Sequence, residues 1–180
     1  ISIMSELRTN RIVPRDGLVS GTGTGGGIIQ IKSTTKTDTF TGSTNSSFAD
    51  ITGFSVSITP TRSDSKIFVM VCVNWSNAGS GGNRVSFRLV RNSTPIAVGD
   101  SAGTRVQATG GGENSGGGGN MKAVTVNHLD NPSTTNPVTY KVQYIANDGA
   151  EFYLNRSTAD SNSVGYIRTV SSISVMEVSG

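Results

Sequence analysis

The chain has 180 residues and a mass of 18.7 kDa, the size of one ordinary domain; 15% of it is charged and 23 residues are glycine. A helical bundle would be richer in Ala, Glu, Lys and Leu, and a disordered chain would lack the runs of Val, Ile and Phe present here. The net charge is only +3 and the basic residues are scattered, which argues against a nucleic-acid partner. No apolar run reaches the roughly 18–20 residues of a membrane helix, and no secretory signal pattern opens the chain. We therefore predict a soluble all-β domain without membrane insertion.

The first 27 residues differ in composition from the rest of the chain. Residues 20–27 are almost entirely glycine and threonine, which is typical of a flexible linker. The short mixed segment before them cannot bury a core alone, so it packs on copies of itself or inserts into a partner. We expect an attachment segment over 1–19, a Gly-rich linker over 20–27 and a β-sandwich domain over 28–180.

Beyond the linker the hydrophobic pattern is that of strands. Residues 54–58 alternate strictly between apolar and polar side chains, as a half-buried strand does. Residues 67–73 are continuously apolar, which predicts a strand covered on both faces. Further strands are predicted at 85–89, 124–126, 140–144, 151–154 and 167–178. About eight short strands with turns between them favour an antiparallel β-sandwich of the jelly-roll kind.

Two glycine-rich connections, 77–83 and 110–120, are predicted to be long loops that are either functional or mobile. Polar side chains in such loops can hydrogen-bond the hydroxyl groups of a sugar. Trp75 would supply a stacking surface if exposed, but at the end of an apolar strand we predict it to lie in the core. The candidate receptor-contact residues are Asn77, Asn83, Glu113, Asn114 and Asn120.

The residues needed for most catalytic and metal sites are scarce. His128 is the only histidine and Cys72 the only cysteine, so the usual zinc ligand sets cannot be assembled. We interpret Cys72 as a small buried hydrophobe and His128 as a surface or interface residue. Cleavage of a polysaccharide would need two converging carboxylates, for which the acidic residues outside the predicted strands are the candidates: Glu113, Asp148, Glu151 and Asp160. We predict a protein that is not an enzyme and has no metal or cofactor.

Four sets of segments are informative as whole phrases of sequence. They are 7–17 followed by the linker and 28–31, 38–40 leading to 58–67, 128–132 with 140–142, and the ending 170–178. These segments resemble small virion proteins of tailed bacteriophages, and the resemblance is greatest to those of cyanobacterial phages that are described as tail-fibre or fibre-like proteins. It spans nearly the whole chain except 74–120.

The resemblance implies a trimeric jelly roll similar to the heads of complement C1q and tumour necrosis factor. It implies that the N-terminal segment packs around the threefold axis or docks into the virion; the alternative is that this segment folds back onto its own domain. The expected docking or trimerisation residues are Leu7, Arg8, Arg11, Ile12 and Val13.

Two functions follow from the resemblance, and both place the protein on the surface of a phage particle beside other virion proteins. In the first, the protein is a homotrimeric, fibre-like knob whose loops contact a glycan or protein on the host surface. In the second, it is a capsid decoration protein, of the cement or head-fibre kind, whose N-terminal segment docks on the phage head.

Overall fold

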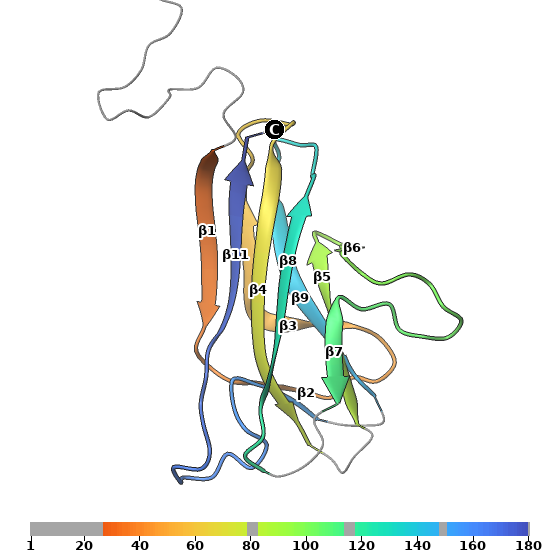
Figure 1. Ribbon diagram of the computed structural model, residues 1–180, viewed down its shortest axis with the longest axis vertical. Helices are drawn as coiled ribbons and strands as arrows, with labels where there is room; N and C mark the ends of the chain where they lie inside the picture. The colour runs from red at the N-terminus through yellow and green to blue at the C-terminus, as the bar shows by residue number, and fades with distance from the viewer. Residues whose placement is uncertain (1–26, 79–82, 114–117, 148–150, 180) are drawn as a thin grey trace, which may run out of the picture.

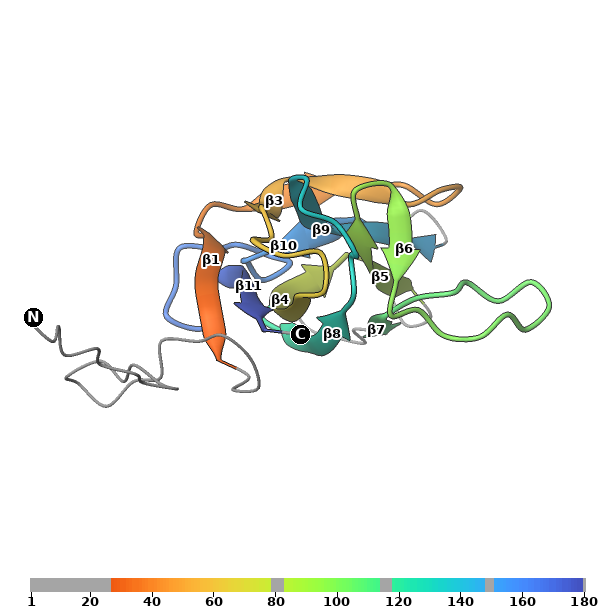
Figure 2. The same ribbon diagram turned by 90° about the horizontal axis from the view of Figure 1, so that it is seen from above.

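The chain folds into a sandwich of two antiparallel β-sheets, as the sequence predicts (Figures 1 and 2). The structure is a computed structural model that describes residues 27–78, 83–113, 118–147 and 151–179. No α-helix occurs within these ranges. The strands are β1 (Ile28–Lys36), β2 (Phe40–Gly42), β3 (Ala49–Ile58), β4 (Lys66–Asn77), β5 (Arg84–Arg91), β6 (Thr94–Ile96), β7 (Gly110–Glu113), β8 (Lys122–Asp130), β9 (Val138–Ala146), β10 (Phe152–Leu154) and β11 (Ser171–Val178).

The order of the strands is that of a jelly roll. One sheet, here called sheet A, runs β1-β11-β4-β8. The short strand β10 pairs with the last residues of β4, and β2 pairs with β10. The other, sheet B, runs β3-β9-β5, with β6 and β7 both paired to β5. The chain crosses repeatedly from one sheet to the other, so strands distant in sequence become neighbours, as β1 and β11 do.

The core lies between the two sheets and is filled by every second side chain of the long strands. Near one end of the sandwich it becomes aromatic. Trp75 and Phe87 meet edge to face with ring centroids 5.5 Å apart, and Phe87 meets Phe152 at 5.3 Å. Tyr144 lies 4.8 Å from Phe152, centroid to centroid. Such ring pairs add to the free energy of burial, so they hold the short strand β10 against β5 and β9, and β4 against β5. Trp75 is fully buried, which confirms its predicted place in the core.

The prediction that residues 67–73 are covered on both faces is wrong. In β4, Ile67, Val69, Val71 and Val73 point into the core and are at most 5% exposed. Phe68 and Cys72 between them are only half-buried and Met70 is exposed, because nothing in the described residues covers the outer face of sheet A. Cys72 is therefore not the buried core residue that was expected.

The loop predicted over 110–120 begins with a strand. β7, with the sequence Gly-Gly-Gly-Glu, pairs with the start of β5. At Gly111 the backbone φ is +153°, and a Cβ there would collide with the carbonyl of Val85. A Cβ on Gly110 would lie 2.8 Å from the Val124 side chain. Glycine is required at these two positions because the backbone of β7 approaches its neighbours too closely for a side chain.

Two buried carboxylates close the end of the sandwich at which β1 begins. Glu177 accepts hydrogen bonds from Gln30 Nε2 at 2.6 Å and from the backbone N and Oγ1 of Thr61 at 2.7 and 2.8 Å. Burial alone would raise the pKa of Glu177, but these hydrogen bonds outweigh it and the pKa is lowered. Asp130 accepts a 2.7 Å hydrogen bond from the Tyr140 hydroxyl and pairs with Arg91 at 2.9 Å. The loops at this end are thereby tied to the sheets.

Val71 tests the assignment of the inner face of β4. Val71→Asp would place a carboxylate without a partner among apolar side chains, and we expect it to cost several kcal/mol and abolish soluble protein. Ser55→Asp, on the exposed outer face of β3, is the matched control and should leave the yield unchanged. Soluble yield and thermal melting measure both variants. A Val71→Asp protein that melts normally would show that this face is not core.

Candidate binding surface at the loop end

The two ends of the sandwich carry different parts of the chain. At one end, uppermost in Figure 1, β1 begins at Ile28 beside the end of β11, and Ser179 N donates to Gly27 O at 3.2 Å. At the other end lie the connection from β10 to β11 and the described ends of the connections from β4 to β5, from β7 to β8 and from β9 to β10. This second end is called the loop end below. Both glycine-rich connections singled out in the sequence reach it.

Backbone hydrogen bonds join these connections to one another. Ala78 N donates to Glu151 O at 2.9 Å, and Ala159 N donates to Gly118 O at 2.9 Å. Thr158 Oγ1 donates to Asn77 O at 3.0 Å. Each bond links segments that are distant in sequence, so the described parts of the loop end form one joined surface.

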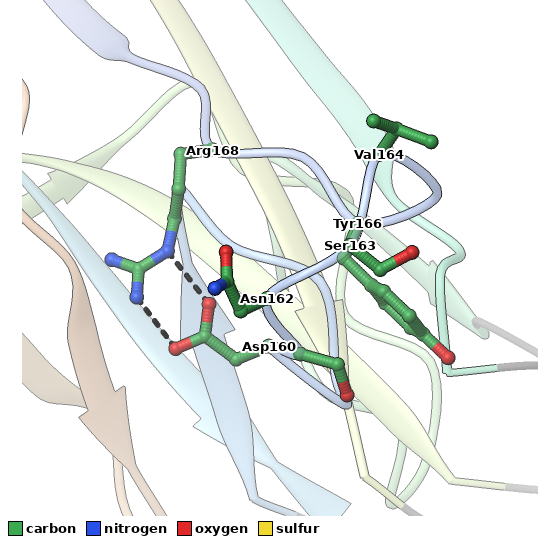
Figure 3. A pocket seen from close by; sticks show the side chains of 7 residues that line it. Asp160, Asn162, Ser163, Val164, Tyr166 and Arg168 are labelled. Carbon is green, nitrogen blue, oxygen red and sulfur yellow. Dashed lines mark hydrogen bonds and ion pairs between the residues drawn. The ribbon is translucent and has the colours of Figure 1, made fainter.

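The connection from β10 to β11 forms an open hollow of about 570 Å³ at this end (Figure 3). The two ends of this connection are held together by backbone pairing. Thr169 N donates to Asn155 O at 3.0 Å, and Arg156 and Arg168 form an isolated antiparallel β-bridge. Asp160 and Arg168 lie on one side of the hollow in Figure 3, and Tyr166 and Val164 lie on the other. The lining residues are Asp160, Ser161, Asn162, Ser163, Val164, Tyr166 and Arg168.

A two-point ion pair holds one wall of the hollow. Arg168 Nε donates to Asp160 Oδ1 at 2.7 Å, and its Nη2 donates to Oδ2 at 2.6 Å. Asp160 has a left-handed backbone with φ +48°, a conformation that aspartate tolerates better than most residues. The carboxylate is thus fixed in place, with lone pairs left to accept hydrogen bonds from a ligand.

The base of this connection is held by a stacked arginine. The guanidinium of Arg156 lies over the Tyr153 ring, 3.8 Å from its centroid, and donates to Ser157 O and Thr158 O. The Tyr153 hydroxyl donates to the Glu151 carboxylate. Burial, followed by that hydrogen bond, raises the pKa of Tyr153, so the phenol stays protonated and Glu151 keeps its donor.

The structure brings most of the predicted contact residues to the loop end but gives them different environments. Asn77 is 3% exposed, and its Nδ2 donates to Asn83 O at 3.2 Å, so it holds the loop from within. Asn83 is half-buried and donates back to Ala78 O. Glu113 is half-buried at the end of β7 and Asn120 is exposed just before β8. Asn114 lies outside the described residues.

The residues expected to dock or trimerise lie outside the described part of the chain. They are Leu7, Arg8, Arg11, Ile12 and Val13. His128 lies in β8, half-buried on the face of the strand that also carries Val124 and Val126.

Within the described ranges, no three His, Cys, Asp or Glu side chains gather closely enough to hold a metal ion. The same ranges contain no helix whose length and apolarity would allow it to cross a membrane.

Sequence reasoning missed the hollow because it placed the last strand too early. The predicted strand over 167–178 begins only at Ser171. Residues 155–170 instead form the long connection that carries Tyr166 and Arg168. The signal was present in the run Asp-Ser-Asn-Ser-Val-Gly-Tyr at 160–166, which has the composition of a turn-rich loop.

No family model matches this sequence, and no curated protein matches it either. Among solved structures, the chain is similar to a chain of infectious bursal disease virus Gx strain, with a TM-score of 0.43, 12% identity and coverage of 96% of this chain and 44% of that one. It is also similar to a chain of the Gt strain, with a TM-score of 0.42, 13% identity and coverage of 96% and 47%. This chain spans less than half the length of either.

Asp160→Asn tests whether the ion pair orders the hollow. The substitution weakens both hydrogen bonds to Arg168, and because the pair is partly exposed we expect at most about 1 kcal/mol of global destabilisation. Amide hydrogen exchange of residues 156–168 should nevertheless become faster. Asp64→Asn, which breaks the exposed pair with Arg62 at the opposite end, is the matched control. Unchanged exchange at 156–168 in Asp160→Asn would mean that the ion pair does not order this wall.

Proposed function

We propose that this chain is a non-enzymatic structural protein of a tailed-bacteriophage virion, a homotrimeric fibre-like knob that attaches the particle to the host surface. The likeness of its sequence segments to phage fibre-like proteins supports this function. A jelly-roll domain with an ordered, polar end supports it further.

The observation that carries the proposal is the separation of the two ends. Residue 27, where the expected attachment segment joins the domain, lies at the end closed by Glu177 and Asp130. The connection from β10 to β11, whose residues line the hollow, lies at the opposite end (Figure 1). A knob held through its N-terminal segment therefore presents the loop end outward.

A host-surface glycan is the ligand whose chemistry best fits this end. The hollow offers fixed acceptors on Asp160, amide and hydroxyl groups on Asn162 and Ser163, and the ring of Tyr166. Sugar hydroxyls pair with carboxylate and amide groups, and the apolar face of a sugar ring can pack on an aromatic side chain. Because the hollow is open, it can admit part of a long surface polysaccharide.

Binding of the purified, fluorescently labelled protein to intact host cells tests this function. Arg168→Ala removes the hydrogen-bonded partner of Asp160 and leaves only Arg156, whose Nη1 lies 3.9 Å from Oδ2 of Asp160. We expect the change to weaken cell binding about tenfold, the equivalent of one lost charge-assisted hydrogen bond. Arg62→Ala is the matched control: Arg62 is also an exposed arginine paired with an aspartate, but it lies at the opposite end.

Equal binding by the two variants, or no binding by the unaltered protein at micromolar concentration, would contradict attachment through the loop end. The number of copies per particle separates the two virion roles. A few copies fit a tail fibre, whereas a large number of copies bound to the head would favour a capsid decoration protein.

A further inference from the structure

The outer faces of the two sheets differ in chemistry. On the outer face of sheet B, Lys141 Nζ and Gln143 Nε2 donate to the Asp50 carboxylate at 2.7 and 2.6 Å. Ser57 and Thr139 join at 2.7 Å across β3 and β9. This face is polar and hydrogen-bonded, as expected for a sheet surface in contact with water.

The outer face of sheet A carries a row of large apolar side chains. The row consists of Ile31 of β1, Met176 of β11, Phe68 of β4 and Leu129 of β8, each directly paired with the next. Ile31 and Leu129, at its two ends, are 55% and 56% exposed. The row spans four adjacent strands, which lie side by side at the front of Figure 1.

Further apolar side chains enlarge this row into a patch. Ile29 and Met70, next to it on the same face, are 43% and 40% exposed. Two further rows cross the four strands toward the loop end. The first contains Met70 and the second contains Cys72, and the other side chains of both rows are serine, threonine or asparagine. Neither row contains a charged side chain. Soluble proteins rarely leave a contiguous apolar surface of this kind in water, so the patch is expected to be covered.

We infer that copies of this chain associate through the outer face of sheet A, with the row Ile31–Met176–Phe68–Leu129 at the centre of the contact. The inference rests on the proposed function to the extent that both require copies of this chain to associate; the number of copies is given by the mass measured below. β1 begins at Ile28, directly after the expected attachment segment and linker, so the row at Ile31 lies near the end of the domain that faces the particle in the proposed knob.

The chemistry and size of the face favour a second copy as its occupant. The three rows from Ile31–Leu129 to Cys72 contain no charged side chain, and Lys66 of β4 lies one row beyond them, at the margin of the face. A second copy therefore meets no charge at the centre of the contact, so the surface is compatible with itself. Four strands of about eight residues make a face of roughly 25 by 20 Å, given the usual strand rise and spacing. Two such faces together bury about 1,000 Å², the lower limit for a specific interface.

The mass of the full chain in solution, measured by sedimentation over a range of concentrations, tests this inference. The unaltered protein should sediment at a multiple of 18.7 kDa. Ile31→Lys with Leu129→Lys should raise the dissociation constant at least about 100-fold, tenfold for each apolar contact replaced by a charge. Both side chains are exposed in a single copy, so the variant should fold and keep the far-ultraviolet circular dichroism spectrum of the unaltered protein.

The matched control is Thr52→Lys with Ser57→Lys, two exposed positions of β3 on the outer face of sheet B, and it should keep the unaltered mass. The single change Leu129→Ser replaces the double variant if the latter unfolds. The inference is overturned if the unaltered protein is monomeric, which is the result expected if residues 1–26 of the same chain cover the face. An unchanged mass and dissociation constant in the sheet A variant also overturns it. Sedimentation needs no host cells, so either result is independent of loop-end binding.

Discussion

The fold depends on the alternation of side chains along β4, the strand with neighbours on both sides throughout most of its length. Ile67, Val69 and Val71 must point inward because they fill the space between the sheets, and this forces Phe68, Met70 and Cys72 outward. A slip of one residue would exchange the two sets. The exposure of apolar side chains on the outer face of β4 is therefore a consequence of the register that fills the core. This register gives one strand two apolar faces, one buried within the domain and one available to another copy of the chain.

The aromatic cluster connects this core to the loop end. Phe152 of β10 packs against Phe87 and Tyr144 of sheet B while pairing with the end of β4. The connections on either side of β10 thus start from a rigid base, and the Asp160–Arg168 pair orders the longer one. A binding surface built from loops gains affinity when it is ordered before the ligand arrives, because less conformational entropy is lost. The connection from β10 to β11 lies at the end of the domain opposite to the start of β1, which is the arrangement that the proposed knob requires.

Local pattern predicted the strands that alternate clearly, such as 54–58 in β3 and 140–144 in β9, and it predicted the sandwich. It could not distinguish one covered face from two at 67–73, since the chemical character of the outward residues is the same as that of the inward ones. Nor could it predict β7, because glycine disfavours strands unless close backbone contact requires it, as beside Val85. The hollow depends on Asp160 and Arg168 meeting across a loop, and no periodicity encodes that contact.

Cys72 gives a direct measure of whether the outer face of sheet A is covered. It is the only cysteine of the chain and lies on that face in β4, half-buried in a single copy. Its rate of reaction with Ellman's reagent can be followed in the full native chain and in the protein carrying Ile31→Lys and Leu129→Lys. Association through this face predicts slow labelling of the unaltered protein and labelling many times faster in the variant. Equal rates in the two folded proteins would contradict it.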